Sequence, residues 1–202
     1  MQGRDLPRYL TGSAAAVLSC YCLIAGRFEP HVFIASVFFI FACVYDTLWA
    51  KIPNFVNASL AIAGLALFFY RDGYPGILVG MAGLALGVAL LLIPWLMGGM
   101  GAGDVKALGA LGALLGPLQL LHVFVYMGLI GGVMAVLHYA FQKNLYAKTC
   151  EWVTTIKTTV LTNDPRMIIP EKTEVSRFPY AAAIAFGYYA YLHFGGIFQS
   201  SP

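Results

Sequence analysis

The sequence predicts an all-α protein, a polytopic bundle of six to seven transmembrane helices. Of its 202 residues, 60% are hydrophobic and only 10% are charged. The mean hydropathy is +0.77. Soluble domains contain roughly 45–50% apolar and about 25% charged residues, because they must cover their core with a polar surface. A bilayer removes that requirement, so we expect residues 1–202 to form a single membrane domain.

The first apolar run covers residues 9–26 and follows Arg4 and Arg8. Basic residues before a short apolar run are typical of a signal peptide. This run continues through Leu23, Ile24 and Ala25, and further apolar runs follow it. We therefore expect it to form the first transmembrane helix.

Proline, glycine and charged residues separate the later apolar runs. They predict helices at 31–48, 55–70, 76–97 and 179–197. The stretch 105–141 is too long for one span, since a helix rises about 1.5 Å per residue and the hydrocarbon core is about 30 Å thick. Gly116-Pro117 marks a natural break. We therefore expect a short helix at 105–116 and a second helix at 118–141.

The distribution of basic residues supports seven segments rather than six. With seven segments and the N-terminus inside, ten of the 12 basic residues lie inside, and only Arg27 and Arg71 lie outside. An unbroken 105–141 span leaves four inside and eight outside. The positive-inside rule favours the first arrangement. Residues 142–178 then form a cytoplasmic loop, whose Leu145, Trp152 and Ile156 show helix-like spacing. This loop helix either lies on the membrane surface or is solvated on all sides.

Several function classes are disfavoured by composition. The four cysteines form no CxxC pair, which argues against a zinc site or a disulfide framework. No histidine and cysteine cluster has metal-ligand spacing, so we expect neither a metal nor a cofactor. A net charge of +3, without a nucleic-acid-binding motif, does not predict nucleic acid as a partner.

Two aspartates stand out because they lie at the ends of apolar helices rather than within loops. Asp46 lies near the end of the 31–48 run, and Asp104 follows the glycine-rich stretch 98–103. Both fall on the cytoplasmic face in the seven-segment topology. Each also has a structural interpretation. Asp104 is suited to capping its helix, and Asp46 is about one turn from Lys51.

Considered together, the two aspartates predict acid–base chemistry. Two carboxylates that share a proton cannot both ionise, so one acts as a base and the other as an acid. Such a pair activates water for attack on a peptide carbonyl and protonates the leaving group. The glycines before Asp104 allow a substrate backbone to approach closely.

Three motifs, in order, resemble those of the prepilin peptidase family of GxGD aspartic peptidases. Residues 46–54 read DTLWAKIPN, similar to that family's aspartate followed by a basic residue and Ile-Pro-Asn. Residues 101–106 read GAGDVK, similar to the GxGDxK element. Residues 178–185 read FPYAAAIA, similar to the run that opens the last helix in shorter members.

The resemblance implies an aspartic endopeptidase of the inner membrane, with its active site facing the cytoplasm. Such enzymes remove the short basic leader from type IV prepilins, pseudopilins, Flp pilins or preflagellins. Asp46 and Asp104 correspond to the catalytic pair. The motifs also suggest substrate-binding or supporting roles for Gly101, Gly103, Lys106, Lys51, Pro53, Asn54, Pro179 and Tyr180.

Some features differ within the family. Larger members carry paired CxxC motifs and a methyltransferase activity, which this chain is not expected to have, so it resembles the compact tight-adherence or preflagellin peptidases. Family members often have basic residues where Thr47–Ala50 are uncharged, which bears on substrate preference. An additional helix also precedes the one with Asp46, compared with the shortest members.

Two alternatives remain at this point. Presenilin-like and signal-peptide-peptidase-like proteases also pair Tyr-Asp with GxGD, but the chain has no Pro-Ala-Leu element. A non-enzymatic transport or assembly protein would need a polar pathway through the bilayer. The polar residues in mid-span are few and share no regular face: Gln119, His122, His138 and His193.

Overall fold

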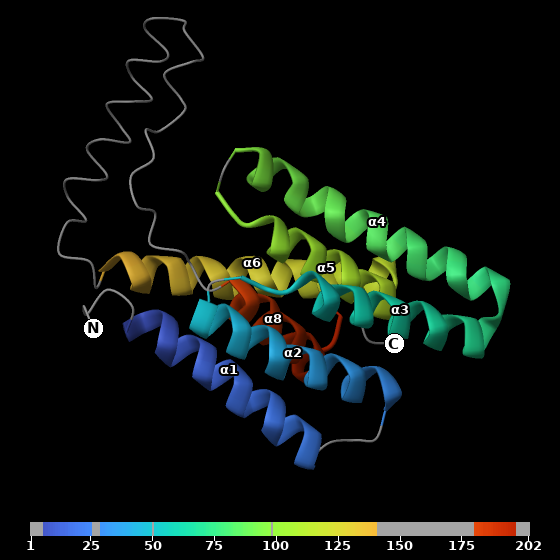
Figure 1. Ribbon diagram of the computed structural model, residues 1–202, viewed down its shortest axis with the longest axis horizontal. Coiled ribbons are helices and arrows are strands. Elements are labelled where there is room, and N and C mark those ends of the chain that lie inside the picture. Colours follow the sequence, from blue (N-terminus) through green and yellow to red (C-terminus); the bar gives the residue numbers. More distant parts are fainter. Residues whose placement is uncertain (1–5, 26–28, 50, 98, 141–179, 197–202) are drawn as a thin grey trace, which may run out of the picture.

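A computed structural model describes residues 6–25, 29–49, 51–97, 99–140 and 180–196. Within these residues the protein is a bundle of seven α-helices (Figure 1). They are α1 (Leu6–Ala25), α2 (Pro30–Trp49), α3 (Asn54–Asp72), α4 (Tyr74–Leu96), α5 (Ala102–Leu115), α6 (Pro117–Ala140) and α8 (Tyr180–Phe194).

The predicted break at Gly116-Pro117 is confirmed. Gly116 has a φ of +80°, a backbone conformation that glycine adopts without steric cost. Its N–H closes α5 by donating to the carbonyl of Gly112 across 2.8 Å. Pro117 then begins α6 at the first helical position, where a missing N–H costs nothing. The loop predicted at 142–178 lies outside the described residues.

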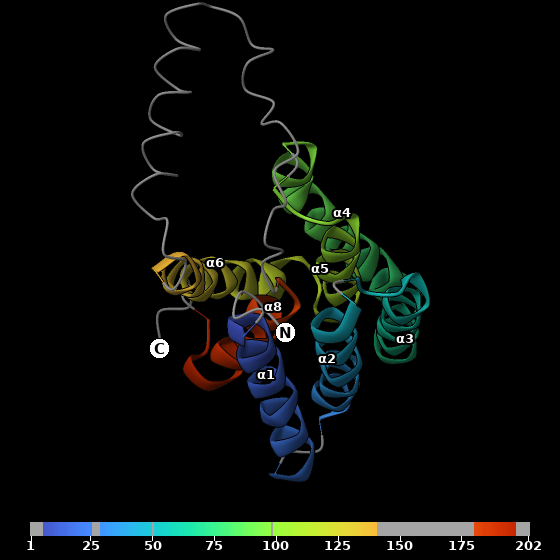
Figure 2. The same ribbon diagram turned by 60° about the vertical axis from the view of Figure 1, so that its left-hand side comes forward.

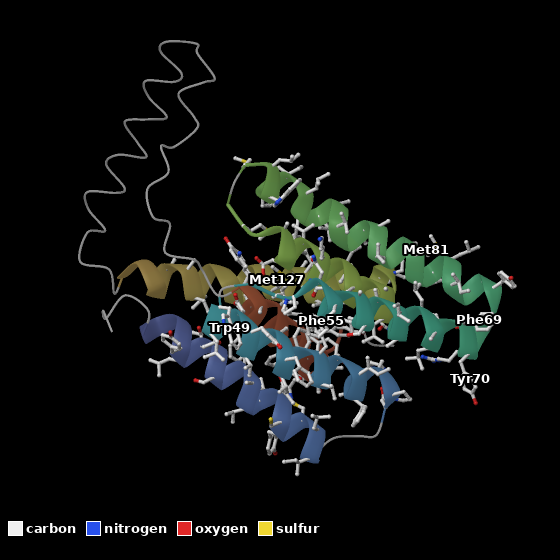
Figure 3. The ribbon with its side chains drawn as sticks, in the orientation of Figure 1. Trp49, Phe55, Phe69, Tyr70, Met81 and Met127 are labelled. Atoms are coloured by element: carbon white, nitrogen blue, oxygen red, sulfur yellow. The ribbon has the colours of Figure 1, made fainter. Side chains whose placement is uncertain are left out.

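Four helices are long and apolar enough to cross a membrane: α2, α3, α4 and α6. In α1 the apolar stretch is shorter, covering Tyr9–Ile24. Large apolar side chains cover the outside of the bundle, as expected where lipid replaces water. Tyr70 and Met81 are examples, and Figure 3 shows them pointing away from the neighbouring helices. The predicted helical membrane bundle is therefore confirmed.

The short helix α5 is the central element of the bundle. Its 14 residues correspond to about 21 Å at 1.5 Å per residue, less than the hydrocarbon thickness. Eleven of them are buried. α5 packs mainly against α3 and α4, whereas α1 packs against α2 and α6 against α8 (Figures 1 and 2). The start of α5 is therefore positioned by neighbouring helices, not by lipid.

Glycines bring α4 and α5 into close contact. Gly83 of α4 and Gly112 of α5 face each other, and a Cβ atom on either would overlap the carbonyl oxygen of the other. Small residues of this kind let transmembrane helices approach closely and gain van der Waals contact. The sequence pattern of glycines in α4 thus fixes the position of α5.

We expect Gly83→Ala to destabilise the bundle. The added methyl group would overlap the Gly112 carbonyl and force the helices apart, at a cost of about 1–3 kcal/mol for overpacking. Thermal unfolding in detergent measures this. Gly128→Ala is the matched control, since a Cβ there meets no atom within 4 Å. Equal melting temperatures for the two variants would contradict the packing described here.

Candidate active site

Two buried aspartates lie at the same end of the bundle. Asp46 is in the last turn of α2, close to Trp49, which Figure 3 labels. Asp104 is in the first turn of α5. Each is only 9% exposed, which is unusual for a carboxylate. The structure thus brings together two residues that are 58 positions apart in the sequence.

The two carboxylates interact electrostatically. Asp104 lies in the first turn of α5, which is not among the four helices that are long and apolar enough to span a membrane. Burial, and to a lesser degree the negative charge of Asp46, together raise the pKa of Asp104 from its ordinary value to about 7. A hydrogen bond from the Gly101 backbone opposes this shift. Near neutral pH, Asp104 is therefore able to hold a proton.

Asp104 also caps its own helix, as the structural interpretation predicted. The N–H of Gly101 donates to Oδ2 of Asp104 across 3.2 Å. The Asp104 N–H donates in turn to the Gly101 carbonyl across 3.1 Å. This reciprocal pair satisfies backbone groups at the start of α5. The cap uses one carboxylate oxygen and holds the side chain in a fixed orientation.

The glycine-rich segment before Asp104 is held by two other helices. The Tyr180 hydroxyl of α8 donates to the carbonyl of Gly99 across 2.8 Å. From α3, the Asn57 amide nitrogen donates to the carbonyl of Gly103 across 3.1 Å. Hydrogen bonds from α3 and α8 therefore fix the segment at both ends.

The Lys-Ile-Pro-Asn motif forms the connection from α2 to α3. Lys51 is exposed, whereas Ile52 is buried and lies beside Gly103. Pro53 is the N-cap residue of α3, in an extended conformation. Asn54 then accepts a hydrogen bond at Oδ1 from Lys106 Nζ across 2.9 Å. The motif thus lies directly against the start of α5.

The structure brings most of the predicted site residues together. They lie at the adjoining ends of α2, α3, α5 and α8, or in the segments directly before α3 and α5: Asp46, Asp104, Gly101, Gly103, Lys106, Lys51, Pro53, Asn54 and Tyr180. Pro179 lies outside the described residues. Lys106 extends toward Asn54, and its charge is not among the groups that shift the pKa of Asp104.

Asn57 was not among the site residues predicted from the sequence. It is a buried polar side chain in the first turn of an otherwise apolar helix. That position alone is the signal by which it could have been found, because burying an amide is costly unless it makes hydrogen bonds. As for metals, the described part of the chain contains no group of three or more His, Cys, Asp or Glu residues able to hold one.

A comparison with protein-family models identifies the chain. Residues 33–136, just over half of the 202, match the model of the type IV leader peptidase family. The chain belongs to this family. The resemblance found in the sequence motifs is thereby confirmed, and the matched region runs from α2 into α6, including both buried aspartates. No curated protein and no solved structure gave a significant match.

Family membership has direct consequences for function. The protein is a membrane peptidase of the type IV leader peptidase family, and its substrates are pilin-like precursors.

Proposed function

We propose that this protein is an aspartic endopeptidase that removes the short basic leader from type IV pilin-like precursors at the cytoplasmic face of the plasma membrane. One observation carries the proposal: Asp46 and Asp104 are buried at the same end of the bundle and interact electrostatically within the family-matched region. Aspartates buried for structural reasons alone would rarely be placed against each other, since like charges repel.

In the proposed reaction the pair shares one proton. The ionised carboxylate takes a proton from a water molecule, whose oxygen attacks the carbonyl carbon of the scissile peptide bond. The protonated carboxyl group donates its proton as the carbon–nitrogen bond breaks, so the new amine leaves protonated. Asp46 is suited to the base role and Asp104 to the acid role, because burial and Asp46 favour the protonated form of Asp104.

The position of the pair suits a substrate that is itself embedded in the membrane. A pilin-like precursor has a basic leader followed by an apolar helix. A site at the end of the bundle can receive the junction between the two without extracting the helix from the bilayer. The predicted excess of basic residues on the same side supports a cytoplasmic orientation. The absence of CxxC pairs from the sequence supports a peptidase without methyltransferase activity.

Cleavage of a precursor tests this proposal. The purified protein is incubated in lipid vesicles with each pilin-like precursor of its host, and products are identified by mass spectrometry. We expect one cut, between the basic leader and the apolar segment, yielding a free N-terminal amine on the mature chain. Failure to cut any precursor in vesicles that support folding would contradict the proposal and favour a non-enzymatic membrane role.

A further inference from the structure

We infer that Asn57 is a positioning residue, which holds the start of α5 so that Asp104 faces Asp46 in a productive arrangement. The inference rests on the proposed function, because it assigns Asn57 a role only through the carboxylate pair. It concerns a residue of α3 outside the three sequence motifs, in contact with the backbone that carries Asp104.

The hydrogen bond of Asn57 acts at the residue next to Asp104. The side chain is 4% exposed, and its Nδ2 donates to the carbonyl of Gly103 across 3.1 Å. Gly103 has no side chain with which to anchor itself by packing. A rotation of the Gly103–Asp104 peptide would therefore break this bond. The bond thus resists the motion that would move Asp104 away from Asp46.

Packing alone does not hold this side of α5. An open groove of about 330 Å³ lies between α3, α4 and α5, and Asn57, Asn54 and Lys106 form its polar part. The remaining lining is apolar, made of Ala58, Ala61, Leu84, Val88, Gly109 and Ala110. Because this side of α5 faces a groove and not a packed helix, fewer contacts hold it there and the directed hydrogen bond matters more for its orientation.

Stability does not explain an asparagine at this position. Among the described residues Oδ1 of Asn57 has no hydrogen-bond partner, although it is buried. An unsatisfied buried polar atom costs free energy, and an apolar side chain of the same shape would avoid that cost. The neighbouring inward positions on α3 are occupied by Val56 and Leu60. Retaining an amide among them is therefore consistent with a requirement for the Gly103 contact.

The role of Asn57 predicts which kinetic constant changes. Asn57 bonds to the enzyme's own backbone, so its removal should leave substrate binding largely intact and slow the chemical step. We expect Asn57→Leu to lower kcat by about 10- to 100-fold, the size of effect that follows from misplacing a reacting group. KM should stay within about twofold of the wild-type value, because the substitution removes no contact with the substrate.

The experiment uses the full-length protein in vesicles with a pilin-like precursor, and measures kcat, KM and the fraction of folded enzyme. Asn57→Ala provides a second variant, and Ser59→Ala is the control, since that hydroxyl donates to Val56 within α3. Unchanged kcat in a folded Asn57 variant would overturn the inference. So would a raised KM at constant kcat, or a loss of kcat that only follows the loss of folded protein.

Asp104→Asn, assayed in parallel, separates the two claims. If Asp104→Asn is inactive while Asn57→Leu retains full kcat, the inference about Asn57 fails and the proposed function stands. If Asp104→Asn cleaves normally, the proposed function fails, and the role of Asn57 fails with it.

Discussion

Asp104→Asn is expected to lower the cleavage rate by about 10²- to 10⁴-fold, the range that general acid–base catalysis contributes. The amide has the same shape as the carboxyl group but cannot donate or accept a proton in the reaction. Its carbonyl oxygen can still accept the Gly101 N–H bond that begins α5. The fold should therefore survive, and the loss should appear in kcat. Initial rates of precursor cleavage, together with thermal unfolding, measure both.

Asp72→Asn is the matched control for this substitution. It makes the same chemical change at the exposed end of α3 that is far from the start of α5. We expect it to cleave at the wild-type rate. If Asp104→Asn remains folded and cleaves as fast as Asp72→Asn, Asp104 serves only as a helix cap.

Asp46→Asn should cause a loss of similar size, for a different reason. Asp46 is the proposed base, and an amide cannot take a proton from the attacking water. Its negative charge also favours the protonated form of Asp104. Replacing it would therefore remove the base and lower the pKa of Asp104 together. The same kinetic assay measures this loss of rate. The pH dependence of the residual activity measures the lowered pKa of Asp104.

The double variant provides the control for a shared role. Residues that act as one unit give non-additive losses, so Asp46→Asn/Asp104→Asn should be no slower than the slower single variant. Two single losses that multiply in the double variant would instead indicate that the aspartates act independently. A wild-type rate for Asp46→Asn would show that this carboxylate has no part in cleavage.

Much of the fold could be predicted because membrane helices leave simple patterns in a sequence. Apolar runs bounded by proline and charge gave the helices to within a few residues. The break at Gly116-Pro117 was predictable, since glycine permits a positive φ and proline cannot continue the ladder of a preceding helix. The loop at 142–178 and the number of membrane crossings remain predictions.

The close packing of α4 on α5 was not predicted. Glycine is common in transmembrane helices, and the sequence does not say which of two helix faces meet. Only the structure shows that Gly83 and Gly112 are opposite each other. That contact explains why a helix of 14 residues can be buried at the centre of the bundle.

In the candidate site, motif spacing identified the aspartates but not the residues that support them. Asp46 and Asp104 stood out because the other acidic residues are predicted to lie in loops, and a charge within a membrane span is costly. The contacts of Asn57 with Gly103 and of Tyr180 with Gly99 link residues that are 46 and 81 positions apart. Single hydrogen bonds over such separations leave no periodic pattern in one sequence.

Chemical cross-linking most directly tests the central claim, that the two aspartates meet at one site. The four native cysteines are replaced by alanine, and Asp46→Cys/Asp104→Cys is treated in vesicles with a short bis-maleimide, which forms a thioether bond with each of two nearby thiols. Asp72→Cys/Asp104→Cys is the control. Residue 72 lies 15 positions along α3 from Asn57, or about 22 Å at the helical rise. We predict rapid cross-linking of the first pair and none of the second. Equal or slower reaction of the 46/104 pair would contradict a shared site.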